Sequence, residues 1–543
     1  MSDAASTDRF DAIIIGGGIS GMYQLYRLRE LGLSVKVYET GTGVGGTWYW
    51  NRYPGARFDS ESYSYGYSFS EELLQEWSWS EHFAAQPETL EYLNYVADKF
   101  DLRKDIQFNT RVRATVYDEA ANLWNIETEA GDQACAPILI TAVGMLSEPK
   151  IVPFEGMDSF EGVSFHTHFS PPEENGFGGK YKDFTGKRVG VIGTGATGVQ
   201  VIQEVSKTCD ELFVFQQVPE WCAPLHNSPI DDETQKEIKA SYPEIFAKCH
   251  DSYANFMHKF DPRSALEVSE EEREALFEKL YQEPGFGIWL ANFHDIFTDR
   301  KANELITEFI RKKIRARVND PELAEKLTPK FYGFGMRRVP METKYYEAYN
   351  QDNVHLVDLS ETPIEQITPT GIKTGDSDYD LDMIIYATGF DVATGAFTKI
   401  DIRGKGGQKL QDKWADGPIN YLGLQTAGFP NMFTLVGPLN ASTFCNIPRC
   451  IEQNVEWVTE MIRYMKEHNL HRAEATKKAE EAWTEEANQL LEATLLPQGK
   501  AWFMGDNIPG KAHRALVYAG GSPLYREKCA EVVKNGYEGF DLS

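Results

Sequence analysis

Two copies of the glycine pattern G-x-G-x-x-G constrain the fold of this chain more than any other feature. The first copy begins at Gly16 and the second at Gly193. Each follows a short apolar run, at residues 11–15 and 187–192, and precedes a helical stretch and a second apolar run. This order is typical of the βαβ unit that opens a nucleotide-binding fold. The 543-residue chain is therefore predicted to be an α/β protein with two such folds.

The first motif combines three glycines with an acidic residue at the end of the next strand. Gly16 allows a tight turn, Gly18 lets the backbone approach a pyrophosphate, and Gly21 lets helix and strand pack closely. The helix N-terminus offers free N–H groups and the positive end of a dipole to phosphates. Glu39 ends the strand predicted at 34–38, where a carboxylate can accept ribose hydroxyls. This acid argues against a 2′-phosphate at the first site.

The second motif, Gly193-Thr194-Gly195-Ala-Thr197-Gly198, lacks that acidic residue. Its second strand, predicted at 212–215, runs into Gln216-Gln217. The absence of a carboxylate permits a 2′-phosphate, which favours NADPH at this site. The positive partner must then come from elsewhere, and Arg337-Arg338 is the best candidate pair in the sequence. Taken alone, such a pair is more often a surface pair of salt-bridging residues.

The chain changes character after the second motif, where charge-rich amphipathic helices are predicted. Within 299–318 the apolar residues follow the helical period, namely Ala302, Leu305, Ile306, Phe309, Ile310 and Ile314. Strands return at 355–357 and 383–386, and the strand at Met383 is expected to lead back into the first domain. We therefore predict discontinuous domains. The first nucleotide-binding domain comprises 1–150 and 385–543, the second comprises 151–228 and 330–384, and a helical insertion occupies 229–329.

Composition excludes several classes of protein. A net charge of −28 and a pI near 4.9 argue against nucleic-acid partners, which require a basic surface. The longest nearly apolar stretch, 138–146, is too short to span a membrane, and the polar residues 1–9 predict no signal peptide. Seven cysteines without a C-x-x-C pair favour free thiols in a reducing cytoplasm. Because the first cysteine is Cys135, the redox pair of two-nucleotide disulfide reductases is missing.

Four further segments carry a resemblance to a known family. Residues 45–59 hold Gly-Gly-Thr-Trp, then Tyr-Pro-Gly and Asp; residues 160–166 read Phe-Glu-Gly-Val-Ser-Phe-His; residues 382–391 contain Ala-Thr-Gly-Phe-Asp; and Trp502 precedes Asn-Ile-Pro-Gly-Lys. From about Phe10 onward the chain resembles the type I Baeyer–Villiger monooxygenases. The resemblance implies two Rossmann-like domains, for FAD and NADP, with a helical insertion. It also implies a monomer or loose homodimer acting on a small ketone and O2.

The resemblance implies a reaction and the residues that catalyse it. NADPH reduces FAD, O2 forms a C4a-peroxyflavin, and the peroxide attacks the ketone to give an ester or lactone. Arg338 is the expected catalytic arginine, because a fixed guanidinium can stabilise both the peroxide and the tetrahedral oxyanion. Asp59 is the carboxylate expected to hold it. His166 is expected to couple the two domains without performing chemistry.

The resemblance also implies binding residues. The loop containing Thr443, Phe444 and Ile447 is expected to wall the ketone pocket, with Cys445 as a small packing residue. Trp50 fits pocket and core equally well. The cofactor-binding residues expected in the two sites are Gly16, Gly18, Gly21, Glu39, Gly46, Thr47, Trp48, Asp59, Tyr65, Gly193, Thr194, Gly195, Thr197, Gly198, Gln200, Gln217, Arg337, Arg338, Ala387, Thr388 and Trp502.

Two positions depart from the family pattern. Ser170 stands where a tryptophan usually follows His166 by four residues, and Gln217 stands where a basic residue often follows the second strand. The second departure leaves Arg337 as the expected contact of a 2′-phosphate. The main alternative is a nitrogen- or sulfur-oxygenating flavin monooxygenase, and the other is a nucleotide-sensing protein without enzyme activity. Turnover of ketones rather than amines under NADPH separates these alternatives.

Overall fold

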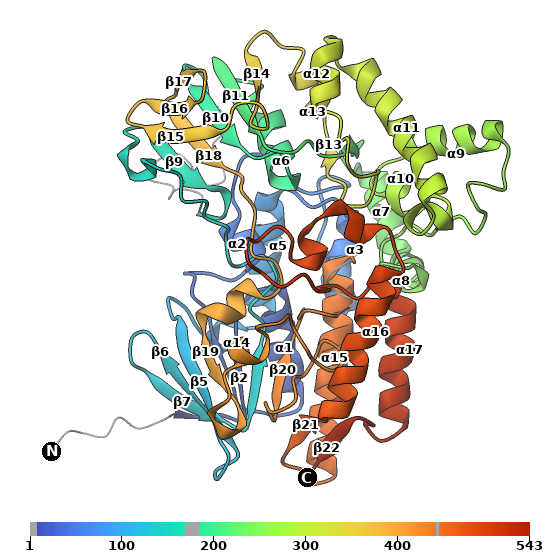
Figure 1. The fold of residues 1–543 in the computed structure, drawn as a ribbon. Coiled ribbons are helices and arrows are strands. Elements are labelled where there is room, and N and C mark those ends of the chain that lie inside the picture. Colours follow the sequence, from blue (N-terminus) through green and yellow to red (C-terminus); the bar gives the residue numbers. More distant parts are fainter. Residues whose placement is uncertain (1–7, 170–183, 441–444) are drawn as a thin grey trace.

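The computed structural model describes residues 8–169, 184–440 and 445–543, which form two lobes (Figure 1). The first glycine motif lies in the lower lobe, in a parallel sheet of order β20-β8-β2-β3-β4. The helix α1 (Ile19–Glu30) joins β2 (Ala12–Ile15) to β3 (Val35–Tyr38), which confirms the predicted βαβ unit. The remaining strands of this sheet are β4 (Ile106–Gln107), β8 (Ile138–Thr141) and β20 (Met432–Thr434). Since β20 comes from the C-terminal part, the chain returns to this sheet after the second motif.

The second glycine motif lies in the upper lobe, in a parallel sheet of order β14-β11-β10-β18-β9. The strand β10 (Arg188–Ile192) leads into α6 (Ala196–Val205), and β11 (Glu211–Gln216) follows, as predicted. The other strands are β9 (Val163–His166), β14 (Val354–Asp358) and β18 (Met383–Tyr386).

The strand β18 corrects one prediction. Its residues pair with β10 from Val189↔Met383 to Ile192↔Tyr386, and with β9 on its other side. The strand at Met383 therefore belongs to the second sheet, and the predicted boundary at 384/385 falls inside it. The physical reason is that an apolar strand with no polar face fits the middle of either parallel sheet equally well. The chain leads back into the first domain only after Tyr386, where Asp401–Arg403 pairs with a strand of the lower lobe.

Smaller sheets flank the two lobes. An outer sheet of order β1-β7-β6-β5-β19 covers the lower one, and a three-stranded antiparallel sheet, β15-β16-β17, lies beside the upper one. Their strands are β1 (Asp8–Arg9), β5 (Val112–Asp118), β6 (Leu123–Thr128), β7 (Gln133–Ala136), β19 (Asp401–Arg403), β15 (Ile364–Thr368), β16 (Gly371–Thr374) and β17 (Asp378–Asp380). Two short pairs complete the strands, β12 (Ala223–Pro224) with β13 (Met341–Glu342) and β21 (Ala473–Ala475) with β22 (Phe540–Leu542).

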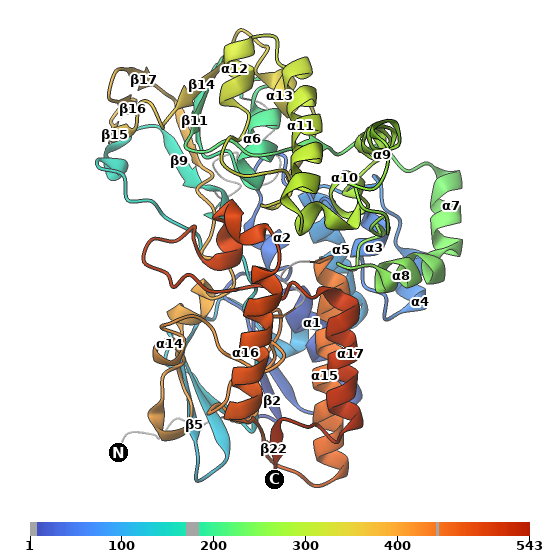
Figure 2. The same ribbon diagram turned by 45° about the vertical axis from the view of Figure 1, so that its right-hand side comes forward.

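Residues 229–329 are helical, as the apolar periodicity predicts, and extend to one side in Figure 2. In α11 (Arg300–Arg317) the predicted periodic residues are buried except Leu305, which is partly buried, and the Asp299 carboxylate caps the helix by accepting from the backbone of Lys301 and Ala302. The other helices of the insertion are α7 (Asp232–Ala240), α8 (Tyr242–Asp251), α9 (Glu270–Gln282), α10 (Gly287–Leu290) and α12 (Pro321–Lys326).

Long C-terminal helices pack on the lower lobe (Figures 1 and 2). The amide of Gln24 in α1 donates to the Thr459 hydroxyl of α15 (Ile447–Glu467) over 3.0 Å. The other helices are α2 (Thr47–Trp50), α3 (Ser62–Tyr65), α4 (Glu71–Glu76), α5 (Gln86–Lys99), α13 (Tyr345–Ala348), α14 (Leu410–Lys413), α16 (Lys477–Glu492) and α17 (Gly521–Lys534).

The cysteines correct a second prediction. Cys445 and Cys450 form a disulfide, with Cα atoms 6.8 Å apart, so these two are not the free thiols expected from composition. They are five residues apart, and the first turn of α15 brings them together. The remaining five cysteines are free and buried. Within the described ranges, no helix is long and apolar enough to cross a membrane.

The central strand β2 offers a test of the fold. Ile14 is fully buried between the sheet and the helices, and truncation there leaves a cavity. We expect Ile14→Ala to lower the free energy of unfolding by about 3 kcal/mol, measured by urea denaturation followed by circular dichroism. The control Val116→Ala removes a side chain that is 39% exposed and should cost less than about 1 kcal/mol. Equal effects of the two substitutions would contradict the placement of β2 in the core.

Candidate active site

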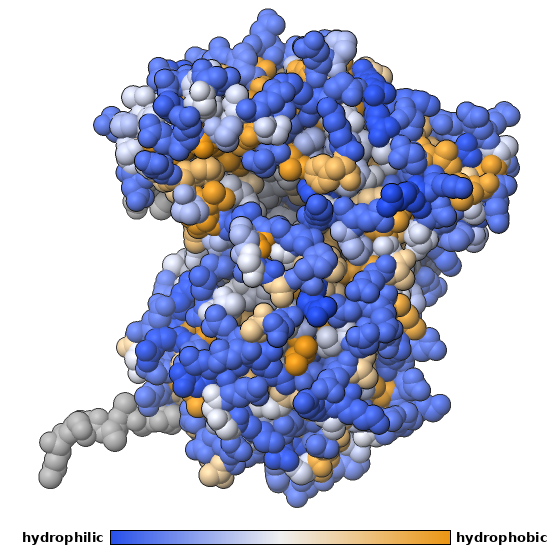
Figure 3. All heavy atoms as spheres, viewed as in Figure 1, coloured by the Kyte–Doolittle hydropathy of each residue, from blue (hydrophilic) through white to orange (hydrophobic). Residues whose placement is uncertain are grey.

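A cavity of about 810 Å³ lies between the two lobes and is lined by residues from both glycine motifs. Figure 3 shows the mostly hydrophilic surface of the molecule, with a recess between the lobes. Gly16 and Gly18 line the cavity from the lower lobe, Gly195 lines it from the upper lobe, and Phe286 lines it from the insertion. Its size suits a ligand larger than a single small substrate.

The first motif has the geometry that its glycines predict. Gly16 has a φ of +110°, and a Cβ there would lie 2.4 Å from the Ala142 carbonyl oxygen. A Cβ on Gly21 would lie 1.9 Å from the Gly16 oxygen, and one on Gly18 would lie 3.3 Å from the Gly46 Cα. Side chains are therefore excluded at the turn and at the helix–strand contact, and the loop at Gly46 lies directly against the motif.

Glu39 lies at the end of β3 and lines the same cavity. The side chain is almost completely buried and accepts the backbone N–H groups of Gly17 and Gly41, each over 2.7 Å. Burial raises the pKa of this carboxyl, while the hydrogen bonds from Gly41 and Gly17 oppose that shift. Two ordered N–H donors hold the carboxylate in place, with further lone pairs for a ligand hydroxyl.

The second motif repeats this geometry around an open space. Gly193 has a φ of +107° and a Cβ there would meet the Ala387 oxygen at 2.5 Å, while a Cβ on Gly198 would meet the Gly193 oxygen at 2.1 Å. At Gly195, by contrast, a Cβ would meet nothing within 4 Å, and this residue faces the cavity. The backbone at Gly195 is thus open to a phosphate group, at the N-terminus of α6.

Asp59 and Arg338 form an ion pair on the cavity wall, although 279 residues separate them. The Arg338 Nη2 atom donates to Asp59 Oδ2 over 2.7 Å. The Asp59 side chain is 1% exposed, whereas that of Arg338 is 38% exposed. Burial raises the pKa of Asp59, and the neighbouring guanidinium opposes this shift. The pair therefore presents a held cation to the cavity.

Arg337 lies next to this pair but has different contacts. Its Nε donates to the Gly499 carbonyl over 2.6 Å, and its guanidinium lies 4.4 Å from the centre of the Tyr332 ring. Its Nη1 lies 4.0 Å from Oε2 of Glu220, which also lines the cavity. The two neighbouring arginines thus face different partners, which argues against a simple surface pair.

Polar contacts join the two lobes beside the second motif. The Tyr53 hydroxyl donates to the Gln200 side-chain oxygen over 2.8 Å, and the Gln200 amide donates to the Arg57 carbonyl over 3.0 Å. Gln200 and Thr197 belong to α6, and both line the cavity. These contacts hold α6 of the upper lobe against the loop that follows α2 of the lower lobe.

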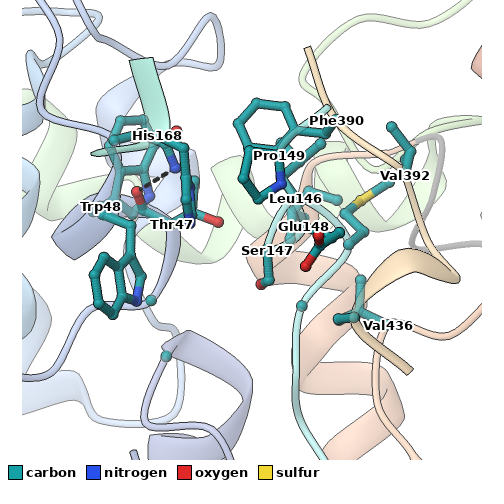
Figure 4. A pocket seen from close by; sticks show the side chains of 18 of the residues that line it. Thr47, Trp48, Leu146, Ser147, Glu148, Pro149, His168, Phe390, Val392 and Val436 are labelled. Carbon is teal, nitrogen blue, oxygen red and sulfur yellow. Dashed lines mark hydrogen bonds between the residues drawn. The ribbon is translucent and has the colours of Figure 1, made fainter. Parts of the chain in front are cut away.

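Aromatic and apolar groups form opposite walls of the cavity (Figure 4). Trp48 and His168 lie on one side and Leu146, Phe390 and Val436 on the other. The Trp48 indole donates to the Tyr65 hydroxyl over 3.0 Å.

The segment from His166 to His168 contacts the wall of the cavity that contains Trp48. The Nδ1 atom of His166 accepts the backbone N–H of His168, whose ring stacks on Trp50 at 5.7 Å between centroids. Burial lowers the pKa of both histidines to about 4, so both are neutral at physiological pH. His166 does not line the cavity, whereas His168 and Trp50 do.

Most residues expected in the site line the cavity together. These are Gly16, Gly18, Glu39, Gly46, Thr47, Trp48, Asp59, Tyr65, Gly195, Thr197, Gln200, Arg337, Arg338, Ala387, Ile447 and Trp502. Those with roles in the turns and contacts behind it are Gly21, Gly193, Thr194, Gly198 and Thr388. Gln217 is exposed at the end of β11 and does not line the cavity. Thr443, Phe444 and Ser170 lie outside the described residues.

Sequence reasoning missed two groups of cavity residues. Phe256, Phe286, Trp289 and Leu290 reach the cavity from the insertion, and their spacing carried no signal because aromatic residues there equally suit a helical core. Glu220 was missed because only the end of the second strand was searched for an acid. A carboxylate four residues beyond that strand was the available signal.

Comparisons with known proteins agree with this site. A family model for flavin-binding monooxygenase-like proteins matches residues 11–227. The chain is 49% identical to the 2-oxo-Delta(3)-4,5,5-trimethylcyclopentenylacetyl-CoA monooxygenase of Pseudomonas putida, over 100% of both chains. It is 42% identical to a cyclohexanone 1,2-monooxygenase of an Acinetobacter species, over 98% of this chain and 96% of that protein.

A solved structure of OTEMO in complex with FAD and NADP matches with a TM-score of 0.96 and 49% identity, over 99% of this chain and 100% of that one. The chain belongs to the Baeyer–Villiger monooxygenases, which confirms the family resemblance of the sequence motifs and the fold with two dinucleotide-binding domains.

Proposed function

We propose that this protein uses FAD and NADPH to insert one atom of O2 beside the carbonyl of a small ketone, giving an ester or lactone. The observation that carries this proposal is the Asp59–Arg338 pair, which presents a held guanidinium to a cavity that both glycine motifs line. The relatives named as cyclohexanone and cyclopentanone monooxygenases support a ketone as substrate, whereas one relative of 42% identity is named as a phenazine N-monooxygenase.

The lower half of the cavity fits FAD. Gly18, at the N-terminus of α1, lines the cavity where a pyrophosphate would bind, and Glu39 offers lone pairs to ribose hydroxyls. Gly46, Thr47 and Trp48 lie against the same motif. When bound, FAD would supply the redox chemistry, by accepting hydride from NADPH and activating O2.

The upper half fits the nicotinamide nucleotide. Gly195 leaves its backbone open at the helix N-terminus, and Arg337 in the wall of the same cavity supplies a cation for a 2′-phosphate. Trp502 lines the cavity from the C-terminal segment, where we assign it to the nicotinamide ribose.

Gly195 permits a test of this nucleotide site that spares the fold. Because the position has open space and a negative φ, Gly195→Val should fold normally but place its side chain where a phosphate would lie. We expect FAD to stay bound and the dissociation constant for NADPH, measured by calorimetry, to rise at least about tenfold. The control Gly375→Val, at an exposed glycine without a positive φ whose added Cβ would meet only the Glu365 Oε1 atom at 3.9 Å, should leave NADPH binding unchanged. Unchanged NADPH binding in Gly195→Val would contradict a nucleotide site at the N-terminus of α6.

Arg338 acts in this proposal as an electrostatic stabiliser. A guanidinium keeps its charge and donates in a planar fork, so it can hold an oxyanion that develops at the ketone carbon. Asp59 fixes the orientation of that fork through the 2.7 Å hydrogen bond. Phe286 and Phe256, with Ile447 at the start of α15, supply the apolar surface that holds a ketone and excludes water.

A substrate panel tests the proposed reaction. Linear, cyclic, aryl and steroid ketones, with an amine and a sulfide as the alternative substrates, are incubated with FAD-loaded protein and NADPH. We expect ketone-dependent NADPH oxidation with ester or lactone identified by mass spectrometry. Oxidation of only the amine or sulfide would replace this proposal with the alternative.

Domain division and assembly complete the proposal. We assign residues 1–150 and the segment after β18 to the FAD domain, 151–228 and 330–386 to the NADP domain, and 229–329 to the insertion, which moves the boundary from 384/385 past Tyr386. The acidic charge supports a monomer or loose homodimer, which size-exclusion chromatography can test. The five free cysteines support the cytoplasm, which cell fractionation can test.

A further inference from the structure

Glu220 is a buried acid in the nucleotide cavity that the proposed reaction does not use. Its side chain is 11% exposed and lies four residues after β11. One carboxylate oxygen accepts from the Tyr332 hydroxyl over 2.5 Å and from the Trp221 backbone over 3.3 Å. The other lies 4.0 Å from Nη1 of Arg337. The carboxylate is thus fixed in place with its free side toward Arg337.

Arg337 is the cation assigned above to the 2′-phosphate, and Glu220 competes for it. A dianionic phosphate placed against this guanidinium would also face the Glu220 carboxylate at short range, where like charges repel. Gln217 offers no compensating charge, because it is neutral, exposed and outside the cavity. The cation assigned to the 2′-phosphate therefore has an anion 4.0 Å away, where a strict 2′-phosphate site needs a net positive charge.

We propose that Glu220 sets the coenzyme selectivity of this protein, by offsetting the charge of Arg337 so that the site discriminates only weakly between nucleotides with and without a 2′-phosphate. The inference rests on the proposed function, in which Arg337 contacts that phosphate. It assigns to Glu220 a role in specificity and none in the oxygen transfer.

The Glu220 carboxyl changes its charge within the physiological pH range. Burial raises its pKa to about 7, and Arg337 opposes this shift. The groups facing it are Arg337, Arg338, Tyr332 and Cys222, and burial raises the pKa of Tyr332 and of Cys222 well above the usual values, which leaves both uncharged. The competing negative charge is therefore present above the folded pKa and lost as the pH falls through it.

Calorimetric titration of the FAD-loaded protein with NADP+ and NAD+ tests the proposal. At about pH 8 we expect Glu220→Gln, which keeps the oxygen that accepts from Tyr332, to bind NADP+ about tenfold more tightly and NAD+ within about twofold of the unaltered protein. At about pH 6 the difference for NADP+ should shrink to about twofold, because the native carboxyl is then mostly protonated. Comparing the two proteins at each pH cancels the titration of the phosphate itself.

Two variants serve as controls. Glu361→Gln changes the net charge equally at an exposed ion pair with Lys326 and should leave both affinities unchanged. Arg337→Gln should weaken NADP+ selectively. If Glu220→Gln leaves NADP+ affinity unchanged while Arg337→Gln weakens it, the role of Glu220 is overturned. If Arg337→Gln also leaves the NADP+ affinity unchanged, Arg337 does not contact the 2′-phosphate, and the inference about Glu220 fails as well. Failure of the oxygenase function would show separately, as no ketone-dependent NADPH oxidation in the unaltered protein.

The unaltered protein provides a test that does not depend on any variant folding. A phosphate beside Glu220 raises the pKa of that carboxyl further, so NADP+ binding at about pH 8 should take up a fraction of a proton. Titration in buffers of different ionisation enthalpy measures this uptake. NAD+ should bind without it, and equal proton uptake with both nucleotides would overturn the proposal.

Discussion

Arg338→Ala should lower ester or lactone formation on the order of 10³-fold while leaving FAD bound. The guanidinium is the cation held in the cavity by Asp59, and alanine provides no donor to an oxyanion there. Because the Arg338 side chain is 38% exposed, its truncation leaves no enclosed cavity and the fold should survive. Product formation is measured by mass spectrometry and bound flavin by its absorbance.

The Arg403–Asp401 pair provides a matched control for this prediction. It has the same 2.7 Å Nη2–Oδ2 distance, but both side chains are about 40% exposed at β19 and neither lines the cavity. Arg403→Ala should therefore keep full activity. Appreciable ester formation by Arg338→Ala, with flavin present, would show that another group stabilises the reacting anions.

Asp59→Asn should lower product formation about 100-fold with FAD still bound. The substitution keeps the shape of the side chain but removes the charge that orients the Arg338 fork. Since the carboxyl is 1% exposed and its Oδ2 atom accepts from the Arg338 guanidinium, its main contribution is electrostatic.

The control for Asp59→Asn is Asp401→Asn, which neutralises the matched exposed pair. A second readout is the pH profile. Burial raises the pKa of Asp59, so activity that needs its carboxylate should fall as the pH decreases through that pKa, and this limb should disappear in Asp59→Asn. An unchanged acid limb in the variant would assign the pH dependence to another group.

The parts of the fold that were predicted correctly are local in sequence. The strand, glycine turn and helix around Gly16 and Gly193 are encoded within about 30 residues each, because the turn geometry and the apolar run determine them. The periodicity of α11 is local in the same way. The boundaries of the predicted strands and of α11 differ from those in the structure by a residue or two.

The features that were missed depend on long-range pairing. The sequence of β18 does not indicate which sheet the strand joins, because all four of its residues are buried and neither face of the strand is polar. The approach of Asp59 to Arg338 could be inferred only through the family resemblance. Phe286 and Glu220 reach the cavity through the packing of the insertion and the loop after β11, which no spacing rule describes.

Incubation of the FAD-loaded protein with NADPH, a ketone and ¹⁸O₂ tests the central claim most directly. The account predicts an ester or lactone containing one labelled oxygen atom, formed by the unaltered protein and absent with Arg338→Ala. NADPH consumption that yields only hydrogen peroxide across the ketone panel, or label recovered only in an amine or sulfide product, would contradict it.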